Sequence, residues 1–410
     1  MSSPTPDPRQ VLRTVFVATF FIRFGFGITV STFAFYLSTS VASVGLASAA
    51  APIIEFATVL LSGIAADRYG RLPVLKFGLL LGAGMLFLMS TTRDPIASTF
   101  LSGFFGLSSG AILAASLAFV GDASGADERG KEMGYFDAVN LLGWVLGFSV
   151  GYVLVSALNG IQDPSRLSSS FLVGALAVLA ALGVLEFATR GFAPGKTGPA
   201  FSWSHIRKAA LDLDVLLVVL PWSVIYMLLG ALFTFLGPSA EHLSLPPWEL
   251  GIIIGVGGLV LLVTQPLYGR WADRFGRAPL MSVGIGGFLG VLLAGSLLAV
   301  YGLNYGALAL LGVSTLAALA FGPSSLAALT DLSRAISRGT TMSLYSLMIA
   351  LGMAVGIGAS SALFTAFQTN GILLFFAGLG VALVGLTAWR LGRGQPRLRE
   401  RIPPPAQPTP

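Results

Sequence analysis

The 410-residue sequence lacks cysteine, has only two histidines, and contains few charged residues, which make up 10% of the chain. Without cysteine the chain can form neither a disulfide nor a thiolate metal site. His205 and His242 both stand in predicted loops with no acid pair or nucleophile constellation beside them, which argues against a membrane-embedded enzyme. Soluble domains carry about 25% charged residues, so this chain has too few to cover a surface that faces water. These absences predict a protein that has no metal or cofactor and is surrounded by lipid rather than by water.

Hydrophobic residues make up 55% of the chain and are gathered into long apolar stretches. A stretch of about twenty residues can cross a hydrocarbon core of ~30 Å at ~1.5 Å per helical residue. The sequence therefore predicts an all-α membrane protein with twelve transmembrane helices, in which Pro238 and the polar Glu241 separate the seventh span from the eighth. The expected spans are 12–38, 43–66, 74–91, 95–120, 132–158, 168–190, 213–240, 247–270, 278–300, 304–330, 339–366 and 370–391.

One eleven-residue phrase occurs twice in the chain. It reads GIAADRYGRLP from Gly63 to Pro73 and GRWADRFGRAP from Gly269 to Pro279, 206 residues later, and seven of the eleven positions are identical. A second set recurs 209 residues apart, as Asp122, Arg129, Gly130 and Met133 and again as Asp331, Arg338, Gly339 and Met342. Two repeats with nearly the same offset predict that the helices form two pseudo-symmetric six-helix bundles.

The duplication divides the chain into four parts. We expect an N-terminal bundle over residues 1–190, a linker over 191–212, a C-terminal bundle over 213–392 and a disordered tail over 393–410. The linker is rich in glycine and proline and then becomes amphipathic, so a short helix is expected to lie on the membrane surface there.

The distribution of lysine and arginine predicts the orientation. With the N-terminus inside, 21 of the 24 basic residues fall in cytoplasmic segments; Arg93 and Arg166 fall outside, and Arg23 lies within a helix. This bias is the positive-inside signature. The net charge of +6 is thus an insertion signal rather than a nucleic-acid footprint. We expect a multi-pass protein of the plasma (inner) membrane, with both termini in the cytoplasm.

The repeated G-x-x-x-D-R-x-G-R phrase resembles the loop signature of the major facilitator superfamily, which lies between helices two and three and again between eight and nine. The resemblance covers essentially the whole chain. It implies a two-bundle rocker-switch carrier with a substrate site between the halves near the bilayer midplane. The drug and metabolite proton antiporter branch is matched incompletely, because Phe148 replaces the proline of its fifth-helix motif and Gly106 replaces an arginine four residues before Gly110. Either Arg23 has taken over the role of that arginine or the protein is not an ordinary proton/drug antiporter.

The aspartates and arginines that recur in both halves predict a charge cluster at the cytoplasmic side, which we call the cytoplasmic latch. Asp67 stands at a helix end near Arg71, and Asp122 and Asp331 close the fourth and tenth helices, so we pair them with Arg71 and Arg277. Gly63 is expected to let neighbouring helices approach closely. The alternative is that these arginines only obey the positive-inside rule. The predicted latch residues are Gly63, Asp67, Arg68, Gly70, Arg71, Asp122, Arg129, Asp137, Gly269, Asp273, Arg274, Gly276, Arg277, Asp331 and Arg338.

Two ionisable residues lie deep in the predicted spans. Glu55 stands twelve residues before Asp67, about 18 Å from the cytoplasmic end, and Arg23 lies at the same depth in the first span. Either charge alone in hydrocarbon costs at least ~2.5 kcal/mol, so the two are expected to pair. A carboxylate balanced between desolvation and a nearby cation can carry a proton. A purely structural ion pair is the alternative, and Leu261 stands at the equivalent position of the second half.

Asn140, Trp144 and Tyr226 complete the predicted proton and substrate site, and the glycine spacings at Gly143 and Gly147 indicate close helix packing. The 29 phenylalanines and the few polar groups in the spans favour an apolar cavity. We therefore expect a monomeric, proton-coupled exporter of an amphipathic or lipophilic small molecule, in contact with lipid and not with nucleic acid. The alternative is an uptake symporter or uniporter of a small organic anion held by Arg23. A sugar porter is disfavoured because the spans lack asparagine and glutamine, and a non-transporting receptor on a carrier fold is left open.

Overall fold

The computed structural model describes residues 8–37, 41–123, 129–190, 211–242, 244–336 and 338–392, and all regular structure among them is helical. The elements of the N-terminal half are α1 (Pro8–Leu37), α2 (Val41–Tyr69), α3 (Arg71–Met89), α4 (Pro95–Ala123), α5 (Arg129–Ala157), η1 (Pro164–Leu167) and α6 (Ser168–Ala188). Those of the C-terminal half are α8 (Leu213–His242), α9 (Pro247–Phe275), α10 (Arg277–Tyr301), α11 (Tyr305–Ala318), α12 (Phe321–Ile336), α13 (Arg338–Phe367) and α14 (Thr369–Gly392).

Twelve spans in the described residues are long and apolar enough to cross a membrane, which confirms the predicted fold class. Two expectations about single spans need correction. The helix α8 continues past Pro238 to His242, and the tenth span is broken into α11 and α12 at Leu319–Ala320. Pro323 follows the break, and because proline has no N–H it leaves the carbonyl four residues earlier without a helical partner. The predicted amphipathic helix at 191–212 and the tail at 393–410 lie outside the described residues, apart from 211–212.

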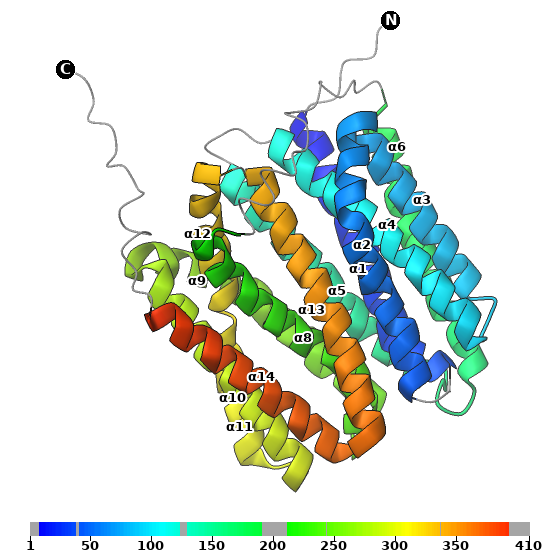
Figure 1. Ribbon diagram of the computed structural model, residues 1–410. Coiled ribbons are helices and arrows are strands. Elements are labelled where there is room, and N and C mark those ends of the chain that lie inside the picture. The colour runs from blue at the N-terminus through cyan, green and yellow to red at the C-terminus, as the bar shows by residue number, and fades with distance from the viewer. Residues whose placement is uncertain are drawn as a thin grey trace, which may run out of the picture.

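The helices form two bundles, α1–α6 and α8–α14, which lie side by side in Figure 1. Their pseudo-symmetry is visible in the backbone of the repeated phrase. The chain turns between α2 and α3 at Gly70, with φ 99° and ψ 153°, and between α9 and α10 at Gly276, with φ 92° and ψ 151°. This conformation is accessible essentially only to glycine. We call the end of the molecule that carries these two turns the motif end; it is the end predicted to face the cytoplasm.

Glycines also set the same helix crossing in both halves. A Cβ on Gly143 of α5 would lie 2.5 Å from the carbonyl oxygen of Phe20 on α1. In the other half, Gly352 of α13 approaches the carbonyl of Ser223 on α8 in the same way. Gly143 and Gly352 are 209 residues apart, the offset of the second sequence repeat. The predicted role of this spacing in close packing therefore agrees with the structure.

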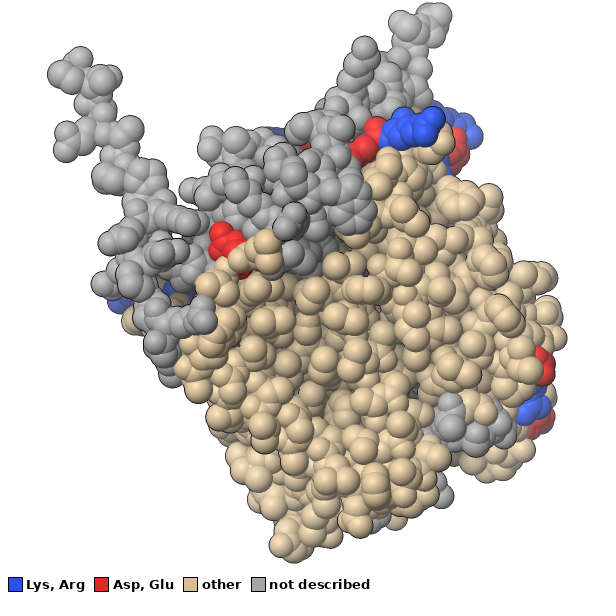
Figure 2. All heavy atoms as spheres, viewed as in Figure 1, with Lys and Arg blue, Asp and Glu red and all other residues tan. Residues whose placement is uncertain are grey.

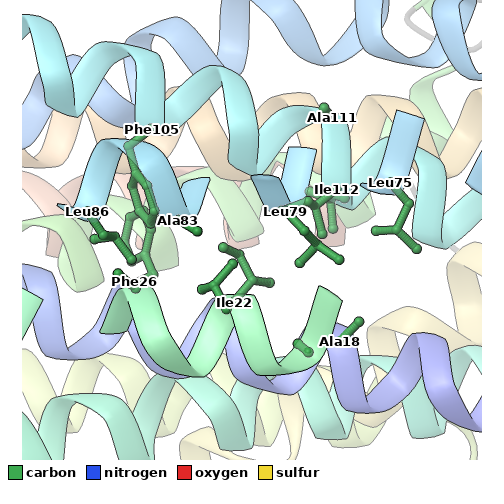
Figure 3. Close-up of a cluster of buried hydrophobic side chains, with 14 of the residues drawn as sticks. Ala18, Ile22, Phe26, Leu75, Leu79, Ala83, Leu86, Phe105, Ala111 and Ile112 are labelled. Carbon is green, nitrogen blue, oxygen red and sulfur yellow. The ribbon is translucent and has the colours of Figure 1, made fainter. Parts of the chain in front are cut away.

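The core of the N-terminal bundle lies where α1, α3 and α4 meet. Ala18, Ile22 and Phe26 follow one another at four-residue intervals and so share one face of α1. Figure 3 shows this face opposite Leu79 of α3, with Phe105 of α4 beside Phe26. All five residues are buried. This face packs α1 against α3 and α4, and Phe26 at its end also reaches Trp144 of α5.

The outer surface is apolar across the middle of the molecule. In Figure 2 the Lys, Arg, Asp and Glu side chains gather toward two ends, and a broad band between them carries none. Large hydrophobic side chains of the membrane-crossing helices are exposed, for example Leu80 at 58%, Val313 at 69% and Val381 at 75%. Such a surface is stable in lipid, and Arg23 and Glu55 are kept away from it inside the N-terminal bundle.

The two halves contact each other through α2 against α13 and α5 against α9. Gly45 near the start of α2 approaches Ser361 of α13, and Gly251 near the start of α9 approaches Ser149 of α5. The backbone N–H of Trp248 donates to Ser156 Oγ across the same interface, at 3.1 Å. These contacts lie toward the end opposite the motif end, so the structure is closed there.

Candidate functional site

A polar cluster surrounds Arg23 near the middle of the N-terminal bundle. The Nε of Arg23 donates to Asn140 Oδ1 at 2.7 Å, and its Nη1 donates to Ser109 Oγ at 3.0 Å. The third nitrogen, Nη2, lies 3.9 Å from Glu55 Oε1. The four residues come from α1, α2, α4 and α5, so this single guanidinium connects four helices. We call Arg23, Glu55, Ser109 and Asn140 the polar cluster.

The ion pair that the sequence predicts is therefore present, and it is buried. Arg23 is 7% exposed and Glu55 is 8% exposed. At 3.9 Å the two charges attract each other without a close hydrogen bond. Asn140 and Ser109 supply the short hydrogen bonds, which lower the cost of burying the guanidinium. The direct contact between Arg23 and Glu55 is thus longer than the hydrogen bonds that Arg23 makes to Asn140 and Ser109.

Gly143 explains why α1 can bring Arg23 so close to Asn140. Its missing side chain leaves room for Phe20 and for the Cβ of Arg23, which would lie 3.0 Å from an added Cβ. Asn140 stands three residues earlier, on the same face of α5. The close crossing of α1 and α5 and the 2.7 Å hydrogen bond therefore depend on one another.

Aromatic side chains lie next to the polar cluster. The ring of Trp144 is 4.5 Å from that of Phe26 and 5.5 Å from that of Phe148, and Phe26 stacks on Phe105 at 5.4 Å. Trp144 is half-buried and stands one turn after Asn140 on α5. An aromatic surface beside a buried charge is suited to a molecule with both an apolar and a polar part.

The C-terminal half contributes aromatic and amide groups of its own. The indole Nε1 of Trp222 donates to Ser325 Oγ at 3.0 Å, and Tyr226, one turn later on α8, lies with its ring 5.8 Å from that of Trp222. The side-chain amide of Gln265 faces Gly322 at the start of α12. Tyr226 and Gln265 are both half-buried. Polar groups of this half therefore gather beside the break in the tenth span.

The N-terminal latch residues meet as the sequence pairing predicts. The guanidinium of Arg71 forms an ion pair with Asp67 on the preceding turn, and its Nε donates to Asp122 Oδ2 at 3.2 Å. Arg71 is buried between the two carboxylates, with an 11% exposed side chain, whereas the side chain of Asp122 is 49% exposed. Arg68 lies outside this cluster, with its guanidinium 5.5 Å from the ring centre of Tyr69. The cluster joins α2, α3 and α4 at the motif end.

The second copy of the predicted latch is described only in part. Arg277 Nη1 donates to the carbonyl oxygen of Ala327 on α12 at 2.6 Å. Arg274 lies over Phe275 with its guanidinium 5.4 Å from the ring centre, which repeats the arrangement of Arg68 and Tyr69. The side chains of five predicted latch residues lie outside the described part of the structure: Arg129, Asp137, Asp273, Asp331 and Arg338.

One expectation about the repeated phrase is wrong for this structure. A Cβ added to Gly63 or Gly269 would meet no atom within 4 Å, so neither glycine is in a close helix contact. The expected close approach of helices is instead found at Gly143, Gly147 and their counterparts in α13. The first glycine of each phrase faces open space at the motif end, where the two halves would have to approach if that end closed.

Sequence reasoning missed Ser109 as a partner of Arg23. Most serines and threonines of membrane helices donate to a carbonyl one turn earlier, as Thr19 does to Val15 at 2.9 Å. A lone serine in a long apolar span therefore gives no sign that it binds a charge. Asn140 was predicted for the site, but its pairing with Arg23 depends on the crossing of α1 and α5 and could not be read from the spacing.

The comparisons with known proteins agree with this architecture. The chain matches the family model of the Major Facilitator Superfamily over residues 15–315, with a second match over 223–410. The chain belongs to the major facilitator superfamily. No curated protein matches it in sequence, and nothing in the match assigns it to the drug and metabolite antiporter branch.

Solved transporters share the fold at low sequence identity. A bacterial homolog of the human lysosomal transporter Spinster, inward-facing and unoccupied, is 14% identical with a TM-score of 0.73, covering 94% of this chain and 96% of that one. The nucleoside transporter NupG is 16% identical with a TM-score of 0.63, over 92% and 98%. The human organic anion transporter MFSD10 is 18% identical with a TM-score of 0.63, over 93% and 100%. These similarities establish a membrane transporter fold.

Proposed function

We propose that this transporter couples the export of an amphipathic or lipophilic small molecule to protons, with Glu55 as the proton-carrying group and Arg23 as its electrostatic partner. The observation that carries the proposal is the polar cluster itself. Arg23 makes short hydrogen bonds to Asn140 and Ser109, while its contact with Glu55 is 3.9 Å long. Glu55 can therefore take up a proton while Arg23 keeps its hydrogen bonds to Ser109 on α4 and Asn140 on α5.

The surroundings of the cluster support the substrate class. Trp144 and Phe148 offer a half-buried aromatic surface beside the charge, with the buried Phe26 packed behind Trp144, and Tyr226 and Gln265 offer polar groups from the other half. Apolar lining with a few convergent polar groups is typical of sites for small organic molecules. In the carrier mechanism that the family uses, such a site lies between the halves and is exposed to each side in turn.

The latch is proposed to control that alternation at the motif end. Arg71 is held by Asp67 and Asp122 within the N-terminal bundle, and Gly63 faces open space. We infer that the motif end faces the cytoplasm and that its closure brings Gly63 and Gly269 into contact with the opposite half. The charge cluster then fixes the ends of α2, α3 and α4 as one rigid unit during the movement.

Symport or uniport of a small organic anion is the second candidate, and one observation favours it. Because Nη2 of Arg23 makes no short hydrogen bond to Glu55, an anionic substrate could take the place of that carboxylate. The organic anion transporter MFSD10 shares the fold. Protons move against the substrate in the first candidate, whereas in the second they move with it during symport and do not move during uniport.

The proposal is tested by measuring proton flux in proteoliposomes that contain a trapped pH-sensitive dye. Amphipathic cations, neutral amphipaths and organic anions are added in turn to one side. We expect amphipathic cations or neutral amphipaths to drive protons in the opposite direction in the native protein and not in Glu55→Gln. Glu186→Gln is the matched control, since Glu186 pairs with Lys76 at 2.6 Å on the outside of the bundle. Proton movement in the same direction as an anion would support the second candidate instead.

A further inference from the structure

A groove of about 320 Å³ lies between α10 and α14, away from the polar cluster. Its walls are Ile285, Gly286 and Leu289 of α10 and Val384 and Ala388 of α14. A Cβ added to Gly286 would meet no atom within 4 Å, and Val384 is 53% exposed. The groove is therefore open on the surface of the C-terminal bundle that faces lipid.

The hydroxyl groups that line the groove already donate hydrogen bonds within their own helices. The two hydroxyls in its lining belong to Ser282 and Thr387. Ser282 Oγ donates to the carbonyl of Ala278 at 3.0 Å, and Thr387 Oγ1 donates to the carbonyl of Leu383 at 2.7 Å, each within its own helix. With its polar groups satisfied, the groove is suited to a hydrocarbon chain.

Arg390 lies where the groove reaches the motif end. It stands in the last turn of α14 and its Nη2 contacts Met281 Sδ at 3.7 Å, one residue before Ser282. Its Nη1 is buried and has no hydrogen-bond partner among the described residues, and none of the ion pairs among those residues involves Arg390. A buried donor without an acceptor is unfavourable. An anionic oxygen at this position would remove that cost.

The depth of the groove agrees with that of an acyl chain. Its lining on α10 begins five residues after Arg277, where that helix starts, so it lies about 7–18 Å below the motif end. That interval belongs to one leaflet of a hydrocarbon core that is ~30 Å thick. Arg390 stands in the last turn of α14, at the same end of the bundle as Arg274 in the last turn of α9 and Arg277 at the start of α10, where the headgroups of that leaflet are expected.

We propose that α10 and α14 form a binding site for an anionic phospholipid of the leaflet at the motif end, with an acyl chain in the groove and the phosphate on Arg390. Charge complementarity selects this occupant: Arg390 contacts Met281, next to the groove residue Ser282, and pairs with no carboxylate among the described residues, which favours a molecule with an anionic head and a hydrocarbon tail. Basic pockets between transmembrane helices are known places for anionic headgroups. The site is independent of the polar cluster and does not rest on the proposed coupling to protons.

The experiment uses the full-length protein in detergent and measures lipid retention by native mass spectrometry together with thermal stability. Phosphatidylglycerol, phosphatidylcholine and inorganic phosphate are added separately. The variants are Arg390→Gln, which removes the cation, and Gly286→Leu, which places a side chain in the groove at a position where an added Cβ meets no atom within 4 Å. The controls are Arg190→Gln, an exposed arginine at the end of the N-terminal bundle, and Gly183→Leu, where an added Cβ also meets no atom within 4 Å.

We expect phosphatidylglycerol to be retained more strongly than phosphatidylcholine and to raise the midpoint of unfolding, while inorganic phosphate has no such effect. Arg390→Gln should weaken retention about fivefold, the factor for removing one cation near an anionic lipid, and Gly286→Leu should weaken it at least as much. Both controls should retain lipid as the native protein does. Equal retention in Arg390→Gln and Arg190→Gln would overturn the proposal, as would equal binding of the two lipids. If inorganic phosphate alone raised the midpoint of unfolding, the site would bind a free anion and not a phospholipid, which would also overturn the proposal.

Discussion

Replacing Gly143 with alanine should damage the polar cluster through the helix crossing that supports it. The added Cβ would lie 2.5 Å from the carbonyl oxygen of Phe20, whereas ordinary contacts need ~3.5 Å. The helices α1 and α5 must therefore separate by about 1 Å. The hydrogen bond from Arg23 to Asn140, now 2.7 Å, would lengthen to about 3.7 Å, which is no longer a hydrogen bond.

The expected loss of stability is about 1–3 kcal/mol, the usual cost of overpacking, measured by thermal unfolding in detergent. The matched control is Gly352→Ala, which disturbs the equivalent crossing of α13 with Ser223 on α8 but leaves the polar cluster alone. Both variants should be destabilised, and Gly143→Ala alone should also lose proton-driven transport and alter its pH profile. If the two variants lost stability and transport in equal measure, the crossing at Gly143 would have no special connection with the cluster.

Three further predictions concern the topology and the latch. A cysteine placed at Tyr305, which is 92% exposed, should react with an impermeant thiol reagent outside intact cells, and one placed at Tyr69, which is 66% exposed, should not; the reverse pattern would invert the orientation. Asp67→Asn should slow transport severely while substrate affinity is kept, because Arg71 loses its nearest carboxylate; parallel loss of binding would place the defect in the site. Gly70→Ala should lower the stability by about 1–3 kcal/mol, since its backbone is accessible essentially only to glycine, whereas Gly63→Ala should be nearly neutral in thermal unfolding.

The fold could be predicted almost completely from the sequence, because lipid imposes a simple rule on span length and composition. The repeated phrase and its offset identified two copies of one unit, and Gly70 and Gly276 indeed share one backbone conformation. The break of the tenth span was not predicted, although Pro323 was a sign of it. Hydropathy averages over a whole span and is insensitive to a single missing hydrogen bond.

The contact in the candidate site that depends on charge could be predicted from the sequence, whereas the contacts that depend on how the helices pack could not. Depth and cost of burial were enough to pair Arg23 with Glu55. The contact of Arg23 with Ser109 could not be foreseen, because it requires the relative rotation of α1 and α4. The expected packing of Gly63 was wrong for the same reason: a glycine permits a close approach without enforcing one, and only the positions of the neighbouring helices determine whether it occurs.

The central claim is that Glu55 carries the coupled proton. The most direct measurement compares substrate transport driven by a pH gradient with substrate exchange at equal pH, in proteoliposomes containing Glu55→Gln, Arg23→Ala or both changes. The account predicts that Glu55→Gln abolishes the first activity and keeps the second, and that Arg23→Ala shifts the pH dependence upward because the cation that favours the ionised carboxylate is gone. A structural ion pair predicts that each single change costs ~3–5 kcal/mol of stability and that the double variant recovers. A double variant that folds and still follows the pH gradient would contradict the account.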